Sequence, residues 1–167
     1  MRTEGMQAMS MVGGRLADEE ALFASLYPAL FRLACVVCPP EGDPDDLVQD
    51  ATARALRRGP LTSLEHPKAY LRRSIVNLAS NERRRLGRQR RAVQRLDRSE
   101  AVEATYASDL VELRALSPTT RAVLWLAEVE GAPYAEIGEQ LGMSEDAART
   151  RAARARAQLR HLMEGER

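Results

Sequence analysis

The sequence predicts an all-α protein, and three observations lead to that prediction. Apolar residues recur every three or four positions through most of the 167 residues, which is the helical period. Most prolines and glycines fall between those segments, where they end one helix before the next begins. The sequence has no β-hairpin signal and no repeat of solenoid length. We therefore expect two small helical domains joined by a flexible linker.

The first expected helix carries apolar residues at helical spacing between Leu22 and Val37. Pro39 and Pro40 end it, and Pro28 is expected to bend or interrupt it. Residues 1–15 are expected to be a disordered tail.

Two further helices complete the first domain, which we place at residues 16–91. The second helix starts after Asp43 and Pro44 with acidic residues in its first turn, and the third runs over about 68–85 before it becomes wholly basic. Gly59 and Pro60 open the loop between them. The expected buried residues are Leu47, Val48, Ala51, Ala55 and Leu56 on the second helix, and Tyr70, Leu71, Ile75, Leu78 and Ala79 on the third.

The second domain, at residues 110–164, follows a linker at 92–109 in which the core pattern weakens. Helices are expected near 110–116 and 118–129, followed by a pair within 134–160. In that pair Gly142 permits the positive φ of a tight turn, and the Ser144 hydroxyl can cap the last helix. Its apolar face is Ala148, Ala152, Ala155, Leu159 and Leu162.

The opposite face of that last helix carries Arg149, Thr150, Arg151 and Arg154. Such a mixture suits phosphates and guanine edges when a helix lies in the major groove, so the pair predicts a helix-turn-helix that binds DNA. The alternative is a solvated face in a protein rich in alanine and arginine.

Charge is segregated along the chain, although the net charge is only +1. Basic residues are concentrated between Arg83 and Arg91, and acidic residues between Glu41 and Asp50. We expect one surface suited to nucleic acid and another suited to a basic protein partner.

The sequence does not indicate a catalytic, metal or cofactor site. Cys35 and Cys38 form a CxxC pair, which could be a redox switch or half a metal site, but no second cysteine pair exists and both histidines lie far away in sequence. We assign these cysteines no site and expect no metal, no cofactor, no catalytic residue and no enzymatic activity.

A cytoplasmic location is expected. The N-terminus lacks the apolar core of a secretion signal, and the apolar run from Leu33 to Cys38 is too short to span a bilayer. We therefore expect no membrane insertion.

Three segments in fixed order carry a resemblance to a known family: DPDDLVQDATARAL, HPKAYLRRSIVNLASNERRR and LSPTTRAVLWLAEVEGAPYAEIGEQLGMSEDAARTRAARARAQLR. Together they resemble the extracytoplasmic-function group of bacterial sigma-70 factors, over about Leu22 to Leu162. The resemblance implies that residues 16–91 are sigma region 2, a helical bundle, and residues 110–164 are region 4, a helix-turn-helix. It implies an alternative sigma factor that binds core RNA polymerase, recognises the minus-35 and minus-10 promoter elements and promotes transcription initiation.

The resemblance also implies partners and residue roles. The partners are promoter DNA and the polymerase, through the clamp helices of its largest subunit and its flap, and the family allows an anti-sigma factor as well. The clamp helices would meet Asp46, Leu47, Gln49 and Asp50. The minus-10 strand would meet Tyr70, Asn77, Arg83, Arg84, Arg85 and Arg88. The minus-35 duplex would meet Arg149, Thr150, Arg151 and Arg154, and the linker would run toward the RNA exit path.

The chain departs from the family pattern where small side chains replace larger ones, at Thr52, Ala53, Ala152 and Ala153, and where Val76 stands at a position commonly held by arginine. These changes thin the core and could alter promoter choice.

Two other functions remain open from the sequence. A stand-alone helix-turn-helix transcriptional regulator would explain residues 134–160, but it leaves the DLVQD segment unexplained. An RNA-binding or nuclease-like basic protein would explain only the arginines from Arg83 to Arg91.

Overall fold

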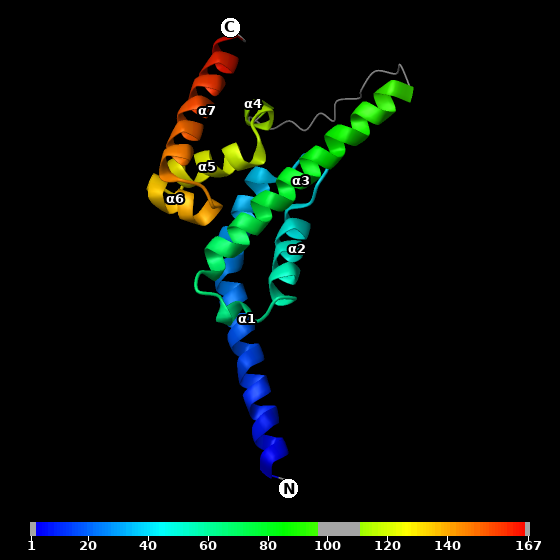
Figure 1. Ribbon diagram of the computed structural model, residues 1–167, viewed down its shortest axis with the longest axis vertical. Coiled ribbons are helices and arrows are strands. Elements are labelled where there is room, and N and C mark those ends of the chain that lie inside the picture. The colour runs from blue at the N-terminus through cyan, green and yellow to red at the C-terminus, as the bar shows by residue number, and fades with distance from the viewer. Residues whose placement is uncertain (1–2, 97–110, 166–167) are drawn as a thin grey trace.

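The computed structural model describes residues 3–96 and 111–165, and every element within those ranges is helical, as predicted (Figure 1). We call α1 to α3 the N-terminal unit and α4 to α7 the C-terminal unit. The elements in chain order are α1 (Thr3–Val37), α2 (Pro44–Leu56), the 3-10 turn η1 (Leu61–Ser63), α3 (Pro67–Leu96), α4 (Val111–Ala115), α5 (Pro118–Glu128), α6 (Tyr134–Leu141) and α7 (Glu145–Gly165).

Several helix ends form as their residues predict. Asp43 caps α2 by accepting a hydrogen bond from the Asp45 N–H at 2.8 Å. Gly142 has a φ of 71° and ends α6. Beside it, the Ser144 hydroxyl accepts from the Ala147 N–H at 3.2 Å at the start of α7. The helix-turn-helix predicted for this segment is therefore present.

The first helix differs from its prediction at two places. Residues 1–15 were expected to be disordered, but α1 begins at Thr3. Glutamate, glutamine, alanine and methionine are strong helix formers and extend it. Pro28, expected to bend or interrupt the helix, lies inside α1 without ending it, because a proline removes one hydrogen bond while Leu30 and Leu33 pack in the core.

The third helix is also longer than predicted. It ends at Leu96, whereas the sequence predicted an end near Arg85. Its basic extension has good helical propensity, and Glu82 and Arg85 pair three residues apart. The first residues of the expected linker are thus helical, and residues 97–110 lie outside the described ranges.

On α2, Leu56 was expected to be buried, but it is 48% exposed because it lies one position beyond the face of Val48 and Ala55.

One helix is long and apolar enough to be considered as a membrane span. Within the segment Gly14–Val37, which has 24 residues, an 18-residue window reaches a mean hydropathy of 1.5. This signal is weak, because the core helix of a soluble protein gives the same one. Only 22% of that window is buried, and α1 supplies core side chains at its C-terminal end, from Leu30, Leu33, Ala34 and Val37. The N-terminal end of α1 extends past the other helices (Figure 1).

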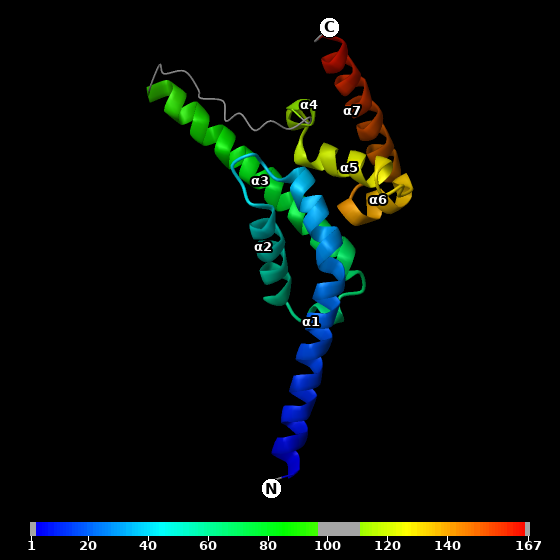
Figure 2. The same cartoon turned by 180° about the vertical axis from the view of Figure 1, so that it is seen from behind.

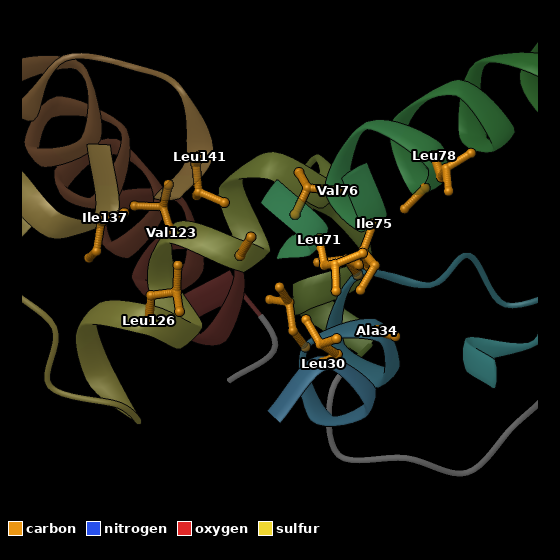
Figure 3. Close-up of a cluster of buried hydrophobic side chains, with 14 of the residues drawn as sticks. Leu30, Ala34, Leu71, Ile75, Val76, Leu78, Val123, Leu126, Ile137 and Leu141 are labelled. Carbon is orange, nitrogen blue, oxygen red and sulfur yellow. The ribbon is translucent and has the colours of Figure 1, made fainter. Parts of the chain in front are cut away.

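Buried apolar side chains of both units belong to one cluster. The N-terminal unit contributes Leu30, Leu33, Leu71, Ile75 and Val76, and the C-terminal unit contributes Val123, Leu126, Ile137 and Leu141. Figure 3 shows members of both sets facing a common interior. Figure 2 shows α5 and α6 lying against α1 and α3. The two predicted helical domains are both present, and in this structure their buried side chains belong to one core.

A buried arginine of α3 links the two units. Arg72, with 1% of its side chain exposed, donates from Nη2 to both carboxylate oxygens of Glu130, each at 2.7 Å. Its Nη1 donates to Gln140 Oε1, and the Gln140 amide in turn donates to Glu136 at 2.6 Å. The cation of one unit is therefore neutralised by the other.

A second arginine links the units at the end of α1. Arg121 of α5 is 7% exposed and donates to the carbonyl oxygens of Val37, at 2.9 Å, and Cys38, at 3.4 Å. Burial lowers the pKa of Arg121 to about 10, so the side chain is still a cation at neutral pH. It lies at the negative end of the α1 dipole, where a cation is favoured.

Candidate nucleic-acid interface

A cavity with a basic rim lies between α2 and α3, and we call it the α2/α3 basic pocket. Its volume is about 630 Å³, and its lining is Arg54, Arg57, Arg58, Tyr70, Arg73, Ser74, Asn77 and Leu78. Tyr70 and Asn77 were expected at a DNA surface, and the structure brings them together. Sequence reasoning missed Arg54, Arg57 and Arg73, although their spacing relative to Arg58, Tyr70 and Asn77 is helical.

The chemistry of this pocket suits an unstacked base and its phosphate. Arg58 Nη1 donates to the Tyr70 hydroxyl at 3.1 Å, so the pocket holds an aromatic side chain and a guanidinium in contact with each other. Aromatic rings and guanidinium planes stack on exposed bases, and arginines neutralise the backbone. Asn77 is exposed and adds amide donors and an acceptor.

The four arginines predicted to bind the same strand lie apart from this pocket. Arg83 donates to the carbonyl oxygens of Leu116 and Ala115 in the C-terminal unit. Arg84 is exposed and lies within 3.5 Å of Asn81 Oδ1. Arg85 and Arg88 line a different groove, also on α2 and α3. Their role in binding DNA stays a prediction.

That second groove, of about 650 Å³, also contains the acids predicted to bind polymerase, so the acidic and basic surfaces adjoin rather than separate. Asp46, Leu47 and Asp50 line it together with Arg85 and Arg88. Asp46 and Asp50 are exposed, and Leu47 is half-buried.

The fourth residue predicted to bind polymerase, Gln49, is exposed but lies outside the lining of this groove. Its side chain donates to Asp45 at 2.8 Å, and Asp45 also accepts from the Tyr27 hydroxyl at 2.8 Å. Gln49 therefore belongs to a network that ties α2 to α1.

A third cavity, of about 530 Å³, lies beside α7 in the helix-turn-helix. Of the predicted DNA-reading residues, Thr150, Arg151 and Arg154 line it. Arg149 points elsewhere: it pairs with Glu145, and its guanidinium lies 5.8 Å from the centre of the Tyr134 ring. The remaining lining is Ala115, Leu116, Ser117, Thr120, Asp146, Ala147, Ala155 and Gln158, of which Ser117, Thr120 and Gln158 are polar groups that sequence reasoning missed.

The cysteines lack the features of a reactive pair. Burial raises the pKa of the Cys38 thiol to about 11, and burial also raises that of Cys35. Both are therefore protonated at neutral pH, whereas the thiolate is the reactive form. Within residues 3–96 and 111–165, no cluster of three His, Cys, Asp or Glu residues could hold a metal ion.

Comparison with known proteins identifies both units. Residues 22–89 match sigma-70 region 2, and residues 110–159 match sigma-70 region 4. The ECF RNA polymerase sigma factor SigM of Mycobacterium tuberculosis is 30% identical over 162 residues, which cover 93% of this chain and 82% of SigM. The chain belongs to the extracytoplasmic-function group of the sigma-70 family. The N-terminal unit thus contains region 2, and the C-terminal unit contains region 4.

Two further relatives of this sigma-70 chain differ in how much of their own length the match covers. The ECF RNA polymerase sigma factor SigJ of M. tuberculosis is also 30% identical, over 84% of this chain, but the chain spans only 48% of SigJ. The solved sigma factor RpoE, in complex with the anti-sigma factor NepR from Bartonella quintana, superposes with a TM-score of 0.63 at 25% identity. That match covers 90% of this chain and 99% of RpoE.

Proposed function

We propose that this protein is an alternative sigma factor that directs core RNA polymerase to promoters with defined minus-35 and minus-10 elements. The observation that carries the proposal is the presence of regions 2 and 4 in one chain and in family order. A stand-alone helix-turn-helix regulator would account for region 4 alone. The protein acts in the cytoplasm by binding, without a catalytic residue or cofactor of its own.

Region 2 has two tasks in this proposal. The exposed acids Asp46 and Asp50, with Leu47 and Gln49 on the same helix, face the clamp helices of the polymerase, where opposite charge guides encounter and fixes register. The α2/α3 basic pocket receives the non-template strand of the minus-10 element. Holding an unstacked base there stabilises the melted DNA through binding energy alone.

Region 4 reads the minus-35 element as duplex, with the N-terminal part of α7 in the major groove. Thr150, Arg151 and Arg154 line one cavity and are the residues best placed to reach base edges and phosphates. Arg149 would first have to leave Glu145, to which it is paired.

The packed arrangement of the two units must open for this function. The names of the minus-35 and minus-10 elements place them roughly 25 base pairs apart, which is about 85 Å of B-DNA. In the structure Arg73 lines the α2/α3 basic pocket and also donates to the Glu139 carbonyl oxygen of the helix-turn-helix, at 3.1 Å. Two units that pack against each other through α3 and α6 cannot reach two elements this far apart, so we infer that the structure is a closed state. An anti-sigma factor is a partner that could act on it.

Changing Asp46 to Arg tests the assignment of α2. Asp46 lies exposed in the first turn, so losing its interaction with the helix dipole costs only about 0.3–1 kcal/mol of stability. Binding to core polymerase should fall by at most about 3 kcal/mol, mainly through slower association. The measurement is a pull-down with core enzyme at physiological salt. Asp18→Arg, which reverses an exposed acid on α1, is the matched control; equal binding by Asp46→Arg and the control would remove the assignment.

A further inference from the structure

We propose that Glu19 is a positioning residue for promoter selection, because its carboxylate holds the loop between α2 and α3 in the shape that faces the minus-10 strand. The inference rests on the proposed function. Glu19 lies on α1, before the first segment that resembles a sigma factor, and more than 40 residues from the loop that it contacts.

The carboxylate of Glu19 accepts three hydrogen bonds from that loop. Its Oε2 accepts from the Leu61 N–H at 2.9 Å, and its Oε1 accepts from the Thr62 N–H at 2.8 Å and the Thr62 hydroxyl at 2.6 Å. Burial alone would raise the pKa of Glu19, but the hydrogen bonds from Thr62 and Leu61 hold it below its ordinary value. Glu19 is therefore ionised at neutral pH, the form that accepts all three bonds.

These bonds supply the cap that η1 lacks. A helical turn begins with N–H groups that have no partner within the turn, and Pro60, at the cap position, provides no side-chain hydrogen bond. Glu19 takes the place of a local capping residue. Leu61, 1% exposed, anchors the inner side of the turn in the core, and Thr62 and Ser63 remain exposed on its outer side.

The loop that Glu19 holds adjoins the α2/α3 basic pocket. Arg58 lies at the start of the loop and Tyr70 lies just after its end. A hydrogen bond joins the two residues, and both line that pocket. Gly59, next to Arg58, has a φ of 154°, which L side chains rarely adopt, and allows the chain to turn away from α2. The exposed residues of η1, Thr62 and Ser63, therefore come only a few positions after Arg58, which forms part of the wall of the pocket that receives the strand.

The effect on function follows from preorganisation. A short loop that contains glycine, proline, serine and threonine samples many conformations when free, and binding a strand would have to order it. A loop already fixed by three hydrogen bonds presents one surface to the DNA, which sharpens the difference between a matching and a mismatching base. Glu19 would thus act on selectivity without touching DNA.

The test compares minus-10 preference in variant holoenzymes. Each variant is combined with core RNA polymerase and offered promoters randomised at the minus-10 element, with a fixed minus-35 element, as duplex and as pre-melted bubble templates. Glu19→Ala should reduce discrimination between the best and mismatched minus-10 sequences by about tenfold on both templates, as expected for losing bonds to a charged acceptor. Glu19→Gln, which keeps one acceptor oxygen, should give a discrimination between that of Glu19→Ala and that of wild type. Thr62→Val, which removes one of the three donors, should have a smaller effect.

Two controls separate positioning from general stability. Glu20→Ala removes the exposed acid next in sequence and should leave preference unchanged. A randomised minus-35 library should give the wild-type preference with Glu19→Ala. Wild-type minus-10 preference in Glu19→Ala, or equal loss at both elements, would overturn the inference while leaving the proposed function intact. An inactive wild-type holoenzyme would overturn both.

Discussion

Replacing Glu130 by alanine is expected to open the closed state. The change leaves Arg72 buried and without its anionic partner, whereas in the open state the same guanidinium is solvated. Removing one partner of a buried pair costs about 3–5 kcal/mol, and because 24% of the Glu130 side chain is exposed we expect about 3 kcal/mol. The ratio of open to closed molecules should rise roughly a hundredfold.

The single tryptophan provides the readout for this change. Trp125 is half-buried and lines a cavity with Cys38 and Pro39 of the N-terminal unit, so separation of the units should shift its emission to longer wavelength. Small-angle scattering should give a larger radius of gyration, and core polymerase should bind more tightly. Glu164→Ala, which removes an exposed acid near the C-terminal end of α7, is the control. An unchanged emission and radius in Glu130→Ala would show that this pair does not hold the units together.

Arg151→Ala is expected to lower transcription and relax preference at one or two positions of the minus-35 element. Arg151 is exposed and lines the cavity on α7. A bidentate contact from arginine to guanine discriminates by about 1–3 kcal/mol, whereas a contact to phosphate weakens all sequences about equally. Arg149→Ala should have a smaller effect than Arg151→Ala, because Arg149 is paired with Glu145.

Selection from a promoter library randomised at the minus-35 element measures this preference for each variant holoenzyme. Arg160→Ala is the matched control, since Arg160 is exposed on α7 but lies further from the end that enters the groove. Arg156 is less suitable, because it donates to Glu128 at 2.9 Å and to Tyr134 at 2.7 Å within region 4. Wild-type preference in Arg149→Ala and Arg151→Ala alike would mean that α7 does not read bases through them.

Local signals in the sequence predicted most of the helices. Asp43 with Pro44, Gly142, and Ser144 each act on neighbouring residues, so their effects can be inferred without knowing the tertiary fold. The sequence does not reveal that the Arg73 guanidinium of α3 lies against Gly142, within 2.5 Å of where a Cβ would stand. The extra length of α3 was missed because arginine-rich segments have helical propensity but no core pattern.

Contacts between distant residues could not be predicted in the same way. Arg72 and Glu130 are 58 positions apart, and nothing in their surroundings distinguishes them from other charged residues of α3 or the α5–α6 loop. The same is true of Glu19 and Thr62, 43 positions apart. For the site, the sequence indicated Tyr70 and Asn77, but it could not show that Arg83 to Arg88 lie outside the lining of the α2/α3 basic pocket.

The most direct test of the central claim measures promoter binding with and without core RNA polymerase. A duplex that carries the minus-35 and minus-10 elements selected by the holoenzyme is titrated with the protein alone, with core enzyme alone, and with both. A sigma factor in the closed state should bind this duplex specifically, and start transcription from it, only when core enzyme is present. Tight, specific binding by the isolated protein that core enzyme does not change would contradict the claim and indicate a stand-alone regulator instead.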